Sequence, residues 1–122
     1  MREILFRGKL KSNDEWSFGN LNVSLRAVVI ITPDETPTGK YGQVIPETVG
    51  QYTGLTDKNG KKIFEGDIVK YRNSSPCQIA YIDSQFVMMW KNNYRNFERV
   101  YDDEIEVIGN IYDTPRIVGG RK

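Results

Sequence analysis

Basic and aromatic side chains alternate toward the C-terminal end of the sequence in a mixture that suits single-stranded nucleic acid. Lys91, Arg95 and Arg99 carry the charge that neutralises phosphates, and Tyr94 lies among them with a ring that can stack on an unpaired base. On a helix the three basic residues fall at i, i+4 and i+8, and therefore form one stripe. Lys91, Tyr94, Arg95 and Arg99 are the candidate nucleic-acid-binding residues of this sequence.

The carboxylates that follow this cluster argue against nucleic acid. Residues 102–106, DDEIE, bring four carboxylates close to the same phosphates and would repel them. These carboxylates could instead pair with the basic stripe, within the chain or across a contact between subunits. We favour a solvated or subunit-contact face, and binding of single-stranded nucleic acid is the alternative.

The residue types on which common catalytic and metal sites depend are scarce. The chain has no histidine and one cysteine, Cys77, so it cannot form a Ser-His or Cys-His pair, and a structural zinc site is not expected. Cys77 lies in the alternating run 77–82 and is interpreted as a small buried hydrophobe. We therefore expect no catalytic residue, no metal and no cofactor. An enzyme that depends on carboxylates is the weakest of the function classes considered.

Two acidic segments resemble sites but are better explained as turns. If Gly60 stood at position 6 of a calcium-binding EF-hand loop, positions 1 and 12 would be Leu55 and Gly66, so both essential carboxylates are missing. Glu65 and Asp67 lie near a predicted strand start, and their geometry is poor for joint acid–base work. Asp67 is expected to accept backbone hydrogen bonds at a tight turn instead.

The overall composition is that of an ordinary globular chain. Its 122 residues are 39% hydrophobic and 27% charged, with 17 basic and 16 acidic side chains and a net charge of +1. The longest apolar run, 27–31, is far shorter than the roughly 20 residues that a membrane helix needs. The first ten residues lack the hydrophobic region of a signal peptide. We therefore expect a cytoplasmic protein without a membrane contact.

Most of the sequence has strand signals. Asn59-Gly60 predicts a type I′ hairpin turn, because this dipeptide supplies two positive φ values. Strands at 77–82 and 86–91 are predicted to pair, with Phe86, Met88 and Trp90 on one face. Val87 and Met89 make the other face apolar as well, so that face needs a cover from a neighbouring lobe or a second subunit. Residues 32–43 are predicted to be a loop, and the aromatic spacing in 92–103 is typical of a helix.

These signals predict a mainly β protein with at most one short helix. Residues 54–115 are expected to form a meander of short strands that resembles a small SH3-like barrel. Residues 1–53 are expected to form an N-terminal β lobe packed on it, and 116–122 a tail.

Three segments carry a resemblance to a known family: MREILFRGK at 1–9, TVGQYTGLTDKNGKKIFEGDIV at 48–69 and EVIGNIYDTP at 106–115. Together they resemble the YopX family of phage and prophage proteins. The resemblance implies an all-β fold and a phage or prophage context, and it carries over no catalytic residue. We expect a non-enzymatic interaction module that assembles into a homo-oligomer and binds a host or phage protein.

Overall fold

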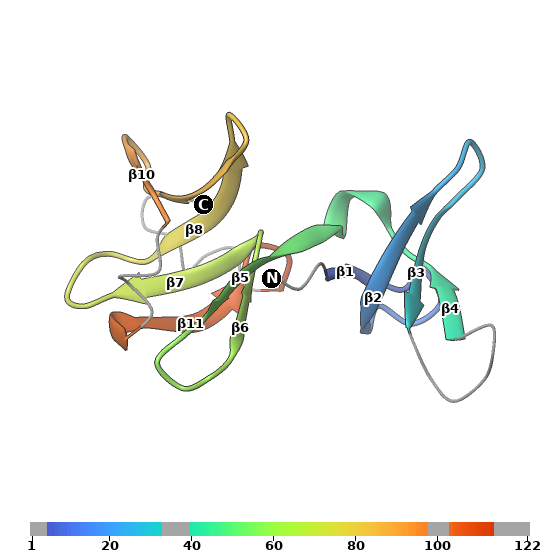
Figure 1. Cartoon of the computed structure of the whole chain (residues 1–122), viewed down its shortest axis with the longest axis horizontal. Coiled ribbons are helices and arrows are strands. Elements are labelled where there is room, and N and C mark those ends of the chain that lie inside the picture. Colours follow the sequence, from blue (N-terminus) through green and yellow to red (C-terminus); the bar gives the residue numbers. More distant parts are fainter. Residues whose placement is uncertain (1–4, 33–39, 98–102, 114–122) are drawn as a thin grey trace. The chain divides into compact units, whose positions relative to one another are not determined.

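The computed structural model describes residues 5–32, 40–97 and 103–113. The chain divides into two compact units, unit 1 at Met1–Tyr52 and unit 2 at Thr53–Lys122. The described residues are mainly β without an α-helix (Figure 1), which confirms the predicted class. Their elements are β1 (Phe6–Lys9), β2 (Trp16–Val23), β3 (Val28–Thr32), β4 (Lys40–Gln43), the 3₁₀ turn η1 (Pro46–Thr48), β5 (Gly50–Thr56), β6 (Lys62–Phe64), β7 (Asp67–Tyr71), β8 (Cys77–Ile82), β9 (Gln85–Met89), β10 (Tyr94–Asn96) and β11 (Ile105–Asn110).

The strands form two antiparallel sheets. The first has six strands in the order β4-β3-β2-β1-β5-β6, and the second has five in the order β10-β9-β8-β7-β11. Strand β4 corrects the predicted loop at 32–43: its residues Lys40–Gln43 pair with Val29–Thr32 of β3. Residues 33–39 of that loop lie outside the described part of the chain. No helix in the described ranges is long and apolar enough to cross a membrane.

The second sheet is an open meander rather than a closed barrel. Strands β7, β8, β9 and β10 follow one another as neighbours, and β11 adds to the free side of β7. Within the described residues β10 does not pair with β11, so the predicted meander is present but a closed barrel is not found. The predicted pairing of 77–82 with 86–91 is confirmed as far as Met89, whereas Trp90 and Lys91 lie beyond the strand, and the turn between the two strands is Asp83-Ser84.

The helix expected in 92–103 is wrong over residues 92–97, where the structure has no helix. Tyr94–Asn96 form strand β10, and Tyr94, Arg95 and Asn96 pair with Met89, Met88 and Val87 of β9. Tyrosine and phenylalanine favour strands as well as fitting helical spacing, and pairing with β9 decides between the two. Arg95 therefore lies on a strand, where alternate residues point to opposite faces, and the predicted helical stripe does not form between Lys91 and Arg95.

The core of unit 2 is built from side chains that alternate between the two faces of its strands. The described cluster of buried side chains consists of Ile63, Val69, Cys77, Ile79, Phe86, Met88, Phe97 and Ile105. Met88 stands opposite Ile79 in the register of β8 and β9, which confirms the predicted inward face of β9. Val87 on the other face is also only 1% exposed. Its cover lies within the single chain, so this strand needs no second subunit to bury it.

The turn between β5 and β6 differs from the predicted type I′ geometry. The Gly60 N–H donates to the Asp57 carbonyl at 3.0 Å, and Gly60 has φ +82°, whereas Lys58 and Asn59 have negative φ. This is a type I turn followed by a left-handed residue, the usual arrangement of a three-residue hairpin loop. Both positive φ values of a type I′ turn occur instead at Asp83 and Ser84.

Replacing Gly60 by valine is expected to destabilise the protein by roughly 1–2 kcal/mol, the cost of the left-handed conformation for a non-glycine residue. No described atom lies within 4 Å of a Cβ added at this position, so the effect is conformational and not a clash. Gly60→Asn is the matched control, because asparagine adopts positive φ more readily. Urea denaturation measures both variants, and an unfolding midpoint of Gly60→Val equal to that of the native protein would contradict the turn geometry.

Candidate binding groove

The inward face of the second sheet continues beyond the core to three larger side chains. Tyr71 follows Val69 by two residues on β7, Trp90 follows Met88 by two just beyond β9, and Arg95 stands opposite Met88 on β10. Side chains two residues apart share one face of a strand. Tyr71 and Trp90 pack against the core and remain half-buried, and Arg95 is exposed. The open end of the core therefore presents two aromatic rings and one guanidinium group.

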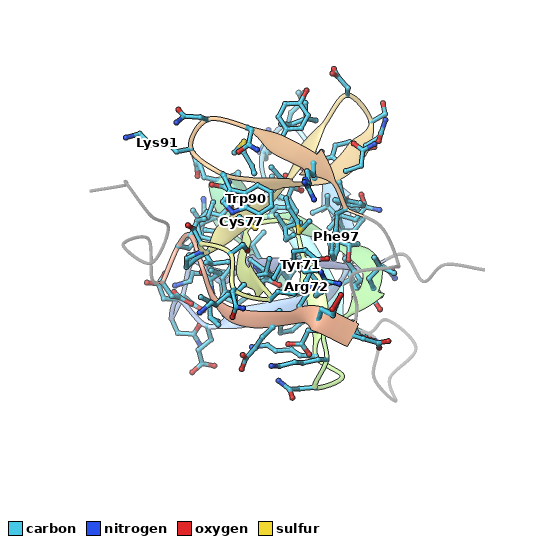
Figure 2. All side chains as sticks on the ribbon, turned by 90° about the vertical axis from the view of Figure 1, so that its left-hand side faces the viewer. Tyr71, Arg72, Cys77, Trp90, Lys91 and Phe97 are labelled. Carbon is cyan, nitrogen blue, oxygen red and sulfur yellow. The ribbon has the colours of Figure 1, made fainter. Side chains whose placement is uncertain are left out.

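The meander brings two turns to this same end of the sheet. Antiparallel strands reverse direction at each connection, so the β7–β8 and β9–β10 turns lie at one end and the β8–β9 turn at the other. The first turn spans residues 72–76, and the second spans 90–93. In the view of Figure 2, Lys91 of the second turn points outward, away from Trp90 and Tyr71, which lie nearer to the middle of the unit.

Hydrogen bonds fix both turns and join them to each other. The Trp90 indole Nε1–H donates to the Ser75 carbonyl at 3.0 Å, which ties the β9–β10 turn to the β7–β8 turn. The Ser74 hydroxyl and N–H both donate to the Tyr71 carbonyl, at 2.7 and 3.0 Å. The Trp90 N–H donates to the Asn93 carbonyl at 2.8 Å. The Trp90 ring therefore has a fixed position, and its polar N–H is already bonded within the chain.

Between the two turns lies an open groove of about 710 Å³. Its lining combines two aromatic rings, two cations, a proline and several amides and hydroxyls: Tyr71, Asn73, Ser74, Ser75, Pro76, Trp90, Lys91, Asn92, Asn93 and Arg95. No carboxylate belongs to this set of described lining residues, so the set carries a formal charge of +2. Its chemistry suits a ligand that combines negative charge with flat, unsaturated rings.

Two carboxylates of the acidic run, Glu104 and Glu106, pair with cations outside the groove. The Arg72 Nε and Nη2 donate to the two Glu104 carboxylate oxygens at 2.6 and 2.7 Å, and the Lys58 ammonium lies 3.7 Å from Glu106. These hydrogen bonds from Arg72 lower the pKa of Glu104. Arg72 also lies over the Tyr71 ring, 5.0 Å from its centroid, and so holds that ring from the side of the turn.

The structure describes three of the four candidate nucleic-acid residues. Lys91 and Arg95 come together as lining residues of the groove, and within the described ranges no carboxylate forms an ion pair with either of them. Tyr94 is 53% exposed and lines a neighbouring hollow together with Met89, because it lies on the opposite face of β10 from Arg95. Arg99 lies outside the described residues.

Tyr71 is an aromatic groove residue that lies outside the cluster identified from the sequence. Its signal is the alternation of Val69 and Tyr71 in the run 67–71, which places the tyrosine on the core face at the end of a strand. Only the aromatic residues near the basic cluster were considered as stacking partners for nucleic acid. The meander order, which was predicted, already requires the end of β7 and the start of the β9–β10 turn to lie at one end of the sheet.

The buried carboxylates of unit 2 have structural partners. Asp57 is 5% exposed. Its Oδ1 accepts the N–H groups of Asn59 and Lys61, and its Oδ2 accepts that of Val107, each at 2.9 Å. Burial raises the pKa of Asp57, but these three hydrogen bonds and the nearby Lys61 charge outweigh burial and lower it. Asp67, 1% exposed, accepts the Phe64 N–H at 2.8 Å, which confirms its predicted role at a tight turn.

Cys77 is fully buried in the core cluster, in the middle of the unit in Figure 2. Burial raises the pKa of its thiol to about 12, so the thiolate that would act as a nucleophile or metal ligand is strongly disfavoured. In the described portion of the chain, no three His, Cys, Asp or Glu side chains are placed to hold a metal ion. Among the described features of unit 2, the groove therefore has the chemistry expected of a binding site.

Comparison with known proteins identifies the family. The sequence matches the family described as YopX protein over residues 5–118, and the chain belongs to the YopX family. The fold is similar to the crystal structure of protein EF1440 from Enterococcus faecalis, with a TM-score of 0.69 and 26% sequence identity. That similarity covers 97% of this chain and 99% of EF1440. No curated protein sequence matches this chain.

Proposed function

We propose that this YopX family protein is a non-enzymatic binding module of the cytoplasm, and that the groove between the β7–β8 and β9–β10 turns is its binding surface. The observation that carries the proposal is the described lining of the groove: two aromatic rings and two cations, with no carboxylate among the lining residues. Rings held by the core and by a hydrogen bond contribute contact area at little cost in conformational entropy.

The positions of the reactive groups favour binding over catalysis. Asp57 and Asp67 have their oxygens in backbone hydrogen bonds, and the Glu104 carboxylate is held by Arg72. The Cys77 thiol is buried. None of these four groups belongs to the lining of the groove, where a catalytic group would have to meet a substrate.

The proposal is tested by affinity purification from a host that expresses the protein, with both protein and nucleic acid identified in the bound material. The groove variant Lys91→Ala/Arg95→Ala removes two exposed cations from the lining. The control variant Lys11→Ala/Arg26→Ala removes two exposed cations of unit 1, and therefore changes the net charge equally. We expect the groove variant to lose its partner and the control variant to retain it. If the two variants recover the same partners in the same amounts, the groove is not the binding surface.

Self-association is the second part of the proposal. The β2–β3 hairpin exposes apolar side chains, with Leu25 fully exposed and Val23 66% exposed. Strand β10 forms one side of its sheet, and all three of its residues are exposed. An edge strand and an exposed apolar tip are common sites of contact between copies of a chain.

Light scattering at micromolar concentration is expected to give a mass that is a multiple of the 14.1 kDa chain. Closed symmetry is the default for such assemblies, so a single discrete mass is expected rather than a continuous distribution. The variant Leu25→Ser should shift the mass toward that of one chain if the hairpin tip lies in the contact. A mass of 14.1 kDa that does not change with concentration would rule out self-association.

A further inference from the structure

We propose that the ligand of the groove is single-stranded nucleic acid, with Lys91 and Arg95 on the phosphates and with Trp90, beside Tyr71 in the lining, as the ring that stacks on an unpaired base. This assignment rests on the proposed function, because it names the occupant of the same groove. The sequence alone favours a solvated or subunit-contact face for these cations, with the carboxylates of 102–106 as one set of partners that could pair with them. In the structure Glu104 and Glu106 pair with Arg72 and Lys58 instead.

The charge of the groove points to an anion. Arg95 and Lys91 are exposed, and the described residues that line the opening with them include no carboxylate. Guanidinium and ammonium groups bind phosphate through charge-assisted hydrogen bonds. The net charge of the whole chain is only +1, so attraction over long distances is weak and the contact is local.

The aromatic and amide groups separate nucleic acid from an acidic peptide. The Trp90 N–H is already bonded to Ser75, so this lining residue has aromatic surface rather than a free donor to contribute to a ligand. Stacking on such a surface needs an unpaired base, which a single strand has and an acidic peptide lacks. Asn73, Asn92 and Asn93 add side-chain amides, each of which carries both donors and an acceptor and can meet base edges of either kind.

The same groups disfavour double-stranded nucleic acid. A duplex keeps its bases stacked inside, so the rings of Trp90 and Tyr71 would meet only the backbone. Two cations are also few for a duplex, whose non-specific binding depends on many phosphate contacts. We therefore expect a single strand to compete much better than a duplex of the same length.

The test is fluorescence anisotropy of a labelled oligothymidylate of about 16 nucleotides, the upper site size of a single OB-fold domain, at about 50 mM salt. Wild type is expected to bind, and the groove variant Lys91→Ala/Arg95→Ala is expected to bind at least roughly tenfold more weakly. The slope of log K against log salt should fall in magnitude by about 1.4, because each phosphate contact on a single strand contributes about 0.7. The control variant Lys11→Ala/Arg26→Ala should keep the affinity and the slope of wild type.

The aromatic contribution is measured with Trp90→Phe and Trp90→Ala. Phenylalanine keeps a ring that can stack, so its affinity should remain near that of wild type, whereas alanine should weaken binding roughly tenfold. Trp90 also packs against the core, so Trp90→Ala can fail to fold. In that case the salt slope of the groove variant, whose two substitutions affect exposed side chains, decides the question.

Three results would overturn the assignment: no binding by wild type at about 50 mM salt, equal binding by the groove and control variants, or better competition by a polyglutamate peptide than by the oligonucleotide. A separate result tests the proposed function. If a protein is recovered from the host by wild type and the control variant but not by the groove variant, the groove is a binding surface for protein and only the nucleic-acid assignment fails.

Discussion

Replacing Asp57 by alanine is expected to lower the free energy of unfolding of unit 2 by about 2–4 kcal/mol, because it leaves the three N–H groups of Asn59, Lys61 and Val107 without their acceptor. These bonds join the β5–β6 turn to β11, and Lys58 adds a backbone hydrogen bond to Ile105. Glu15→Ala is the control, since it removes an exposed carboxylate and should change stability by less than about 0.5 kcal/mol. Urea denaturation at neutral pH compares the two.

The contribution of Asp57 should also depend on pH in a definite direction. Its pKa is lowered in the folded protein, and in the unfolded chain it is about 3.9. The stabilisation by the ionised Asp57 carboxylate is therefore fully present above its unfolded-state pKa of about 3.9. It is lost as pH falls through the lower pKa of the folded protein. The difference in stability between wild type and Asp57→Asn should narrow below pH of about 4. If Asp57→Ala is as stable as Glu15→Ala, Asp57 does not hold this turn to β11.

The Cys77 thiol is expected to react with a maleimide at pH 8 at least roughly a thousandfold more slowly in the folded protein than in denaturant. A thiol with a pKa of about 12 forms far less thiolate than a free thiol with a pKa of about 8.5. Burial also blocks the reagent, which slows the reaction further.

The rate of modification is followed by mass spectrometry with and without denaturant. The folded protein should react only as fast as unit 2 opens, so Asp57→Ala, which destabilises this unit, should react faster than wild type. Rapid modification of the folded wild-type protein would contradict a buried structural thiol and would reopen Cys77 as a nucleophile.

Local patterns in the sequence are sufficient to predict the meander of unit 2. The alternation of Phe86 and Met88, together with the polar turn at 83–85, predicts the β8–β9 pair, and both side chains lie in the core. The structural role of Asp67 was also predictable, because its partner Phe64 is only three residues away. In each case the interaction that decides the structure is close in the sequence.

The features that the sequence did not predict have two causes. The helical spacing of Tyr94 and Phe97 is overridden by a local interaction, the pairing of β10 with its neighbour β9. The others depend on interactions between distant residues. The third hydrogen bond of Asp57 joins it to Val107, 50 residues away, and no local pattern indicates it. The charges of Glu104 and Glu106 looked like partners of the basic stripe, and only the pairing of β11 with β7 brings Glu104 to Arg72.

The candidate site was therefore half predictable. Lys91 and Arg95 were identified from their residue types, although the helical geometry given for them was wrong. Tyr71 was missed because it is distant from the cluster in the sequence and joins it only through the order of the strands. A predicted meander, followed strand by strand, is sufficient to place the two turns at one end of the sheet.

Hydrogen–deuterium exchange is the most direct test of the claim that the groove between the β7–β8 and β9–β10 turns is the binding surface. Exchange is compared for the chain alone and for the chain with the partner recovered by wild type from the host. Slower exchange in the presence of the partner is expected in residues 71–76 and 90–95, and the groove variant Lys91→Ala/Arg95→Ala should lose this change. Slower exchange confined to unit 1, with the two turns unchanged, would contradict the account.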